Sequence, residues 1–166
     1  IYWNSDLRCK FCGIRLSLEA GKTIKEKTES QLAEVAMKAE ELDKINHVTL
    51  TTGTMNLRDK GTKKLAQCVA AIKKKSSLPI HVQFEPPSEM KFLEELAESG
   101  VDTVGIHIES FDSKVLSYMA PAKAKIGMER FRKTWQRAVE IFGKNQVSSF
   151  VIVGLGEKPA KIIEGS

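Results

Sequence analysis

The sequence predicts an α/β protein in which a parallel sheet curls into a partial (β/α) barrel of the TIM-barrel-like type, truncated at about four repeats. Two observations lead to this prediction. Segments with the spacing of amphipathic helices alternate with short strand-like runs four times along the chain, and such alternation is typical of parallel sheets. Three of the strand-like runs also carry one polar face, which suits a barrel lumen better than an open sheet covered by helices on both sides.

The first two repeats have clear boundaries. Thr28 and Gln31 form a Thr-x-x-Gln capping box, and the apolar stripe after it predicts a helix over residues 29–44. The run HVTLTT predicts a strand over residues 47–52. A second stripe over residues 65–72 predicts another helix, and the chain reopens after Pro79 as a strand over residues 80–84. Between Cys12 and the first helix we expect only a mixed polar connection.

The last two repeats follow the same order. A helix around residues 92–96 ends at Gly100 and precedes a strand over residues 102–108. A helix over residues 131–142 ends at Gly143 and precedes a strand over residues 146–153. No low-complexity linker divides the chain, so we predict one domain over residues 1–166, with a loop at residues 3–13 before the repeats.

Strand alternation predicts which side chains face the lumen. The polar set comprises His47, Thr49, Thr51, His81, Gln83, Glu85, Gly105, His107 and Glu109, and aliphatic or aromatic residues alternate with them. Chemistry in such barrels sits at the carboxyl ends of the strands. The candidate site therefore combines the turn at residues 51–54, Glu85, Glu109 and the turn at residues 154–157.

Composition and charge exclude several classes of function. The net charge is +5, but the densest basic run, residues 73–75, falls where a helix ends and where cations are favoured, so we do not expect nucleic-acid binding. The longest mainly apolar stretch, residues 147–156, is far shorter than the roughly 20 residues of a membrane span. We expect a cytoplasmic protein without a membrane partner. Because the chain starts at Ile1 and stops just after a strand-like run, we expect a piece of a longer protein.

Cys9 and Cys12 form a Cys-x-x-Cys loop followed by Gly13. Two thiolates at this spacing converge on one metal or cluster, or form a redox pair, and Phe11 between them can shield the sulfur atoms from water. A closed zinc site needs two further ligands, and the sequence has no second pair at a compatible spacing. Cys68 lies on an apolar helical stripe, where a buried free thiol is expected.

Two further patterns leave alternatives to consider. In residues 154–157 (GLGE) the third glycine of a dinucleotide-binding motif would fall on Pro159, which argues against a Rossmann site. The three histidines of the polar face, with Glu85 and Glu109, keep open a metal-dependent TIM-barrel hydrolase. However, His47 and His81 lie at strand starts, the end of a barrel that serves stability.

Taken together, these residues resemble the radical S-adenosylmethionine (radical SAM) superfamily from Cys9 to Glu157. That family carries three cysteines in a loop, usually as Cys-x3-Cys-x2-Cys with an aromatic residue before the last, and Cys9, Phe11 and Cys12 match its final part. Ser5 stands where the usual spacing places the first cysteine, and Trp3 where a Cys-x5-Cys-x2-Cys variant places it. The third ligand is therefore expected upstream of Ile1, or it is lost.

The resemblance also implies a set of cofactor contacts. The family's Gly-Gly-Glu turn, which contacts the cofactor amine, looks like the turn ending in Thr52, Gly53 and Thr54, without its acid. The strand-end residues that hold the ribose and carboxylate look like Gln83, Glu85 and Glu109. The Gly-x-Ile-x-Gly-x-x-Glu segment beside the adenine looks like Phe150, Ile152, Gly154 and Glu157, with Phe150 in place of the first glycine.

The function that the resemblance implies is that of a radical SAM enzyme core. A 4Fe-4S cluster held by Cys9 and Cys12 would reductively cleave S-adenosylmethionine to a 5′-deoxyadenosyl radical, which abstracts hydrogen from a small-molecule substrate. An electron donor such as ferredoxin or flavodoxin is implied. The resemblance is greatest to the biotin-synthase-like branch with the radical SAM protein of iron-guanylylpyridinol cofactor synthesis and uncharacterised bacterial relatives. We expect the truncated core to be inactive alone. A non-catalytic iron-sulfur or RNA-binding relative is the remaining alternative.

Overall fold

Four parallel strands form one sheet in the computed structural model, which describes residues 8–166. In chain order they are β1 (Val48–Thr51), β2 (Ile80–Gln83), β3 (Thr103–Gly105) and β4 (Val147–Ser148). Each strand pairs in parallel with the next one along the chain. A sheet whose spatial order equals its sequence order is one side of a (β/α) barrel, so the expected fold class is confirmed. The positions of Trp3 and Ser5 lie outside the described residues.

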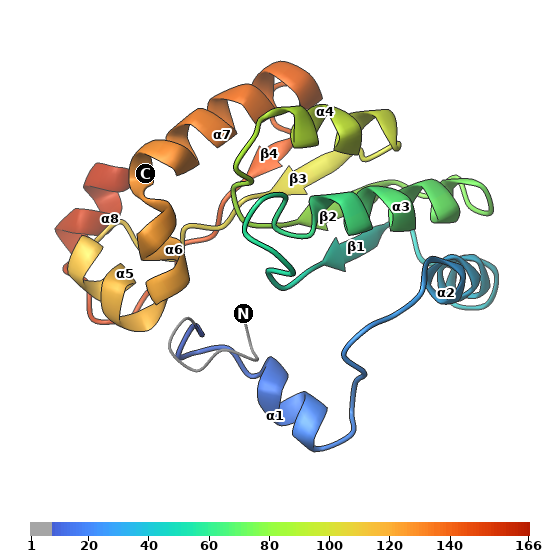
Figure 1. Ribbon diagram of the computed structural model, residues 1–166, viewed down its shortest axis with the longest axis horizontal. Helices are drawn as coiled ribbons and strands as arrows, with labels where there is room; N and C mark the ends of the chain where they lie inside the picture. Colours follow the sequence, from blue (N-terminus) through green and yellow to red (C-terminus); the bar gives the residue numbers. More distant parts are fainter. Residues whose placement is uncertain (1–7) are drawn as a thin grey trace.

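The expected amphipathic helices connect and cover these strands. They are α2 (Glu29–Leu42), α3 (Thr62–Lys73), α4 (Lys91–Glu98) and α7 (Met128–Phe142). Helix α2 packs beside α3, α3 beside α4, and α4 beside α7, and Figure 1 shows α3, α4 and α7 along one side of the sheet. The capping box begins α2 as expected, since the Thr28 hydroxyl accepts from the Gln31 N–H and the Gln31 side chain accepts from the Thr28 N–H.

The two faces of the sheet differ as strand alternation predicted. Val82, Val104, Ile106 and Ile108 are fully buried beneath the helices, with exposed fractions of 0%. Burial of each such side chain contributes roughly 1.5–3 kcal/mol. Side chains on the opposite face, such as Gln83, remain only half-buried. Cys68 belongs to the core on α3 and is 3% exposed, in agreement with the expected buried thiol.

Four short helices were not predicted. They are α1 (Ile14–Glu19), α5 (Ser113–Met119), α6 (Pro121–Ile126) and α8 (Pro159–Gly165). Helix α1 corrects the expectation of a purely irregular connection after Cys12. With six or seven residues each, these helices are too short to show an apolar stripe. Local signals do exist, because Asp112 accepts from the Lys114 and Val115 N–H groups at the start of α5, and proline opens α6 and α8.

The strands predicted over residues 102–108 and 146–153 are much shorter than expected. Gly105 pairs with Ser148, and the next pairing joins Glu109 to Val151. Between these two pairings, the segment that follows β3 contains one residue more than the segment that follows β4. This arrangement is a β-bulge, which bends a strand and redirects its side chains. Glu109 at its end has a φ of 71°, a left-handed conformation that is uncommon for a residue other than glycine.

Side chains replace ladder hydrogen bonds in the bulge. The Ile108 N–H donates to Ser149 Oγ at 3.2 Å, and the Phe150 N–H donates to His107 Nδ1 at 3.1 Å. The regular ladder ends where these side chains take over, which explains the short strands. None of the helices within residues 8–166 is long and apolar enough to cross a membrane.

Candidate functional site

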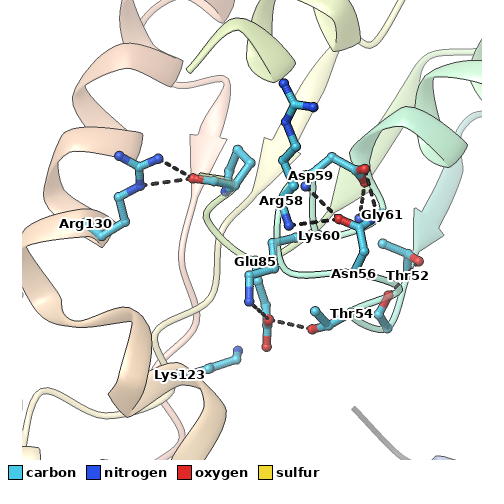
Figure 2. A network of polar contacts seen from close by, with 12 residues as sticks. Thr52, Thr54, Asn56, Arg58, Asp59, Lys60, Gly61, Glu85, Lys123 and Arg130 are labelled. Atoms are coloured by element: carbon cyan, nitrogen blue, oxygen red, sulfur yellow. Dashed lines mark hydrogen bonds and ion pairs between the residues drawn. The ribbon is translucent and has the colours of Figure 1, made fainter. Parts of the chain in front are cut away.

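The carboxylate of Glu85 is held at the carboxyl edge of the sheet by residues that follow β1. Thr54 Oγ1 donates to Glu85 Oε2 at 2.5 Å, and Lys60 Nζ lies 3.7 Å from the same oxygen (Figure 2). The Lys60 and Glu85 side chains are only 10% and 15% exposed. Within the described residues, Glu85 Oε1 has no hydrogen-bond partner, so one carboxylate oxygen remains available.

The loop between β1 and α3 has a defined local structure that positions Lys60. Asn56 Oδ1 accepts from the Arg58 and Asp59 N–H groups, and Asp59 Oδ1 accepts from the Gly61 N–H at 2.7 Å (Figure 2). Asparagine and aspartate favour such turns because their short side chains reach nearby backbone groups. Gly61 has a φ of 89°, and a Cβ there would lie 2.8 Å from the Thr52 side chain, so glycine is required.

Glu109 has a different partner on the other side of the site. Lys123 Nζ, from α6, lies 2.5 Å from Glu109 Oε1 and donates to the His107 carbonyl oxygen at 2.6 Å. The two charged side chains are 11% and 12% exposed. The Ile152 N–H donates to the Glu109 carbonyl oxygen at 2.8 Å, which places the Ile152 backbone beside Glu109.

The cysteine loop lies against α5. Cys9 is half-buried and Cys12 is exposed, and the Cys12 N–H donates to the Cys9 carbonyl oxygen at 3.1 Å to form a turn. The Lys10 N–H donates to the Met119 carbonyl oxygen at 2.8 Å. The Lys10 ammonium lies 2.9 Å from the centre of the Tyr118 ring. These contacts hold the turn that carries both thiols against α5.

The charged groups at the strand ends change the pKa of the Cys9 thiol. Burial raises the pKa of the Cys9 thiol, the Lys123 ammonium acts against this by lowering it, and the carboxylates of Glu85 and Glu109 raise it further. Cys9 therefore shares one electrostatic environment with the two acids and Lys123. Metal binding requires the thiolate, and the Lys123 ammonium offsets only part of the effect of burial, so the pKa of Cys9 remains raised.

The other predicted site residues are less closely connected. The Thr52 hydroxyl donates to the neighbouring Gly53 carbonyl oxygen, and Gln83 has no side-chain hydrogen bond within residues 8–166. The Gly154 N–H donates to Glu157 Oε1 at 3.0 Å, while Glu157 Oε2 is buried without a partner in the described part of the chain. Phe11 is 37% exposed. The hydrogen bonds thus connect Thr54 with Glu85, Glu109 with Ile152, and Gly154 with Glu157.

The cysteine loop is the candidate metal-binding site among the described residues. Within residues 8–166, no three His, Cys, Asp or Glu side chains converge so that they could hold a metal ion. The histidines expected for a metal-dependent hydrolase therefore form no such group. Cys9 and Cys12 on one turn, with Lys123 beside Cys9, fit two ligands of an iron-sulfur cluster. The positions considered for a third ligand precede residue 8.

Sequence reasoning missed the two lysines that hold the acids. Pro121 at the first position of α6 is a recognisable helix-start signal. However, Lys123 and Lys125 are both on that helix, and only the tertiary contact with Glu109 distinguishes Lys123. Lys60 lies in a loop whose Asn56 and Asp59 are typical of turns. Its contact with Glu85 joins the segment after β1 to the segment after β2, and residues close in sequence do not reveal such a contact.

Known proteins are similar to this chain in sequence pattern and in fold. A model of the family described as the radical SAM superfamily matches residues 5–164. Methylornithine synthase (PylB) is similar in structure, with a TM-score of 0.64 and 16% identity over 80% of this chain and 37% of that chain. HydG, a maturase of the [FeFe]-hydrogenase, is similar with a TM-score of 0.70 and 19% identity over 93% of this chain and 34% of that chain. At this identity the likeness shows a shared fold, and the chain spans little more than a third of either structure. No curated protein matches the sequence.

Proposed function

The chain belongs to the radical SAM superfamily, and from that premise we propose that it forms the core of an enzyme that cleaves S-adenosylmethionine to abstract hydrogen from a small molecule. Members of this superfamily bind a 4Fe-4S cluster and S-adenosylmethionine. The observation that carries the proposal is the turn that brings Cys9 and Cys12 together against α5, where the Lys123 ammonium lowers the pKa of the Cys9 thiol and the strand-end carboxylates raise it.

Cys9 and Cys12 would hold the cluster through their thiolates. When bound, the cluster and S-adenosylmethionine supply the electron and the radical chemistry that breaks a substrate C–H bond. Lys123 stabilises negative charge at Cys9, and the contact of the Lys10 backbone with α5 keeps the loop at the carboxyl edge of the sheet. The exposed Cys12 side of the loop leaves a short path for an electron donor such as ferredoxin or flavodoxin.

The two strand-end acids have separate binding roles in this proposal. Thr54 and Lys60 hold Glu85 Oε2, so Glu85 Oε1 is free to accept from the amine of S-adenosylmethionine. Lys123 holds Glu109 Oε1, so Glu109 Oε2 is left for a ribose hydroxyl. The remaining contacts proposed for the cofactor are Phe11, Thr52, Gly53, Thr54, Gln83, Ile152, Gly154 and Glu157.

We also propose a biosynthetic role, in the production of a cofactor. HydG, a hydrogenase maturase, shares the fold, which supports a role in assembly chemistry without identifying the product. A cytoplasmic location suits an oxygen-sensitive cluster and free thiols such as Cys68.

Anaerobic reconstitution of the full-length protein that contains this chain, with iron and sulfide, tests the ligand assignment. We expect Cys9→Ser and Cys12→Ser to lose the bound iron, the acid-labile sulfide and the visible absorbance of a cluster. Cys68→Ala is the matched control, because Cys68 lies in the core away from the loop. One zinc ion per chain, or equal cluster loading in the two serine variants, would contradict the assignment.

Product analysis tests the catalytic part of the proposal. After reduction with dithionite, we expect the loaded full-length protein to release 5′-deoxyadenosine and methionine even without substrate. An intact cluster that binds S-adenosylmethionine without forming either product would favour a non-catalytic iron-sulfur protein. A salt-sensitive complex with RNA in the same preparation would favour an RNA-binding relative.

A further inference from the structure

Two imidazoles converge over Gly105 on the polar face of the sheet. His107 Nε2 and His81 Nε2 lie 2.8 Å and 2.9 Å from the position that a Cβ on Gly105 would take. The two nitrogens are therefore separated by less than the sum of these distances. Neither nitrogen has a hydrogen-bond partner within residues 8–166, and His107 Nε2 is buried. The missing side chain of Gly105 is what allows both rings to lie there.

The contacts of the His107 ring determine its tautomer. The Phe150 N–H donates to His107 Nδ1 at 3.1 Å, so Nδ1 carries a lone pair and the proton of the neutral ring lies on Nε2. The ring stacks on Phe150 with 3.9 Å between centroids and 4° between planes. Lys123 donates to the His107 carbonyl oxygen. The His107 ring is thus held by Phe150 and its backbone by Lys123, with the Cε1–Nε2 edge of the ring against Gly105.

His81 can present a second donor. Its Nδ1 lies 2.6 Å from Thr103 Oγ1, and when that hydroxyl donates to Nδ1, the proton of the neutral ring also lies on Nε2. Burial lowers the pKa of His81, and it lowers the pKa of His107 to about 4. Both rings are therefore neutral near pH 7, and each carries a single N–H.

We propose that His81 and His107 form a subsite that binds an sp² oxygen of the substrate, a carbonyl or carboxylate oxygen, between their two Nε2–H donors. This inference rests on the proposed function, because it assigns the subsite to the substrate of that lumen. A buried N–H without an acceptor is unfavourable, and an oxygen between the two rings would satisfy it. His81 precedes Glu85 by four residues on its strand and His107 precedes Glu109 by two, so the subsite lies deeper in the lumen than the cofactor contacts.

Histidine tautomers in the full chain without cluster test this subsite. We expect ¹⁵N NMR at neutral pH to show both His81 and His107 with the proton on Nε2. Acetate and acetamide serve as carboxylate and neutral carbonyl probes, and at least one of them should shift both Nε2 resonances. Shifts with acetate alone indicate a carboxylate, and shifts with both indicate any carbonyl oxygen. His47, exposed at a strand start, is the internal control and should not respond. A proton on His81 Nδ1, or no response to either probe, overturns the proposal.

Two variants separate binding from folding. His107→Asn keeps an acceptor for the Phe150 N–H but removes the Nε2 donor, so probe binding monitored at His81 should weaken about tenfold in a folded chain. Gly105→Ala places a methyl group between the rings and should abolish the response. Unchanged probe binding in His107→Asn overturns the pairing of the two rings. None of these measurements uses the cluster. A negative result for the histidine subsite is therefore distinguishable from a failure of cluster loading or of S-adenosylmethionine cleavage.

Discussion

Glu85 and Glu109 end neighbouring strands of one sheet, yet the protein holds them in different ways. Glu109 follows a β-bulge, has a φ of 71°, and lies 2.5 Å from the buried ammonium of Lys123. Glu85 has the Thr54 hydroxyl as its close partner, while Lys60 stays at 3.7 Å. A buried charge with a direct counterion is fixed in place, whereas a carboxylate with a more distant cation keeps more capacity for a ligand. We therefore propose that Glu109 serves mainly the architecture of the site, with only its Oε2 left for a ligand, and that Glu85 serves mainly binding.

The largest effect is expected at the Glu109 side. Lys123→Met removes the counterion and leaves a buried carboxylate uncompensated, which should lower the free energy of unfolding by about 3–5 kcal/mol. Urea unfolding followed by circular dichroism measures this change. Lys125→Met on the same helix is exposed and should cost less than about 0.5 kcal/mol. A similar loss in both variants would remove the distinction between the two acids.

A smaller effect is expected at the Glu85 side. Thr54→Val keeps the shape of the side chain but removes the hydroxyl that donates to Glu85 Oε2. Hydrogen bonds to charged groups contribute about 1.5–3 kcal/mol, and this loss should appear in the same urea experiment. Thr51→Val, at an exposed position of β1, is the control. A loss larger than that of Lys123→Met would reverse the ranking of the two sites.

Glu85→Gln tests the proposed binding role of Glu85 through the affinity for S-adenosylmethionine. The amide still accepts from Thr54, so the chain should remain folded, but the negative charge for the cofactor amine is gone. We expect S-adenosylmethionine to bind about tenfold more weakly, a change of about 1.4 kcal/mol. Equilibrium dialysis against the reconstituted full-length protein measures it. Wild-type affinity in Glu85→Gln would show that Glu85 is not the amine ligand.

The smallest effect concerns pH. Burial and the Lys123 charge lower the pKa of His107 from 6.5 to about 4, so the unfolded chain takes up a proton at a higher pH than the folded chain. The contribution of His107 to stability is complete above pH 6.5 and is lost as the pH falls toward 4. Because His107 is only half-buried, solvent screening reduces this effect to about 1 kcal/mol, and the wild-type Tm should fall about 2–4 °C more than that of His107→Asn in this range. Parallel curves for the two proteins would show that His107 does not titrate in this way.

The elements that local sequence predicts best are those with a long, regular pattern. The Thr28 capping box and the apolar stripes of α2, α3 and α7 depend on residues three or four positions apart. The faces of β2 and β3 were also predicted, because alternation alone separates Val82 from Gln83. Helices of six or seven residues, such as α1 and α6, contain too few turns for the same reasoning.

The candidate site was predictable only in part. The residue types at the strand ends and the Cys-x-x-Cys spacing indicated the family, and the family match confirms that interpretation. The sequence did not indicate the bulge before Glu109, because it arises from the pairing of residues about 42 positions apart. It also did not indicate that Lys123 would be buried beside Glu109.

The sequence by itself determined the order of the strands and of α2, α3, α4 and α7, the apolar and polar faces of the sheet, and the cysteine pair, because each depends on contacts within a turn or on strand alternation. Only the tertiary structure decided which charged groups meet. Lys123 reaches Glu109, Thr54 reaches Glu85, and His81 approaches His107 because parallel strands bring their ends to one edge of the sheet. The energy of such buried contacts depends on distance and desolvation, and neither quantity can be derived from residues that are close in the sequence.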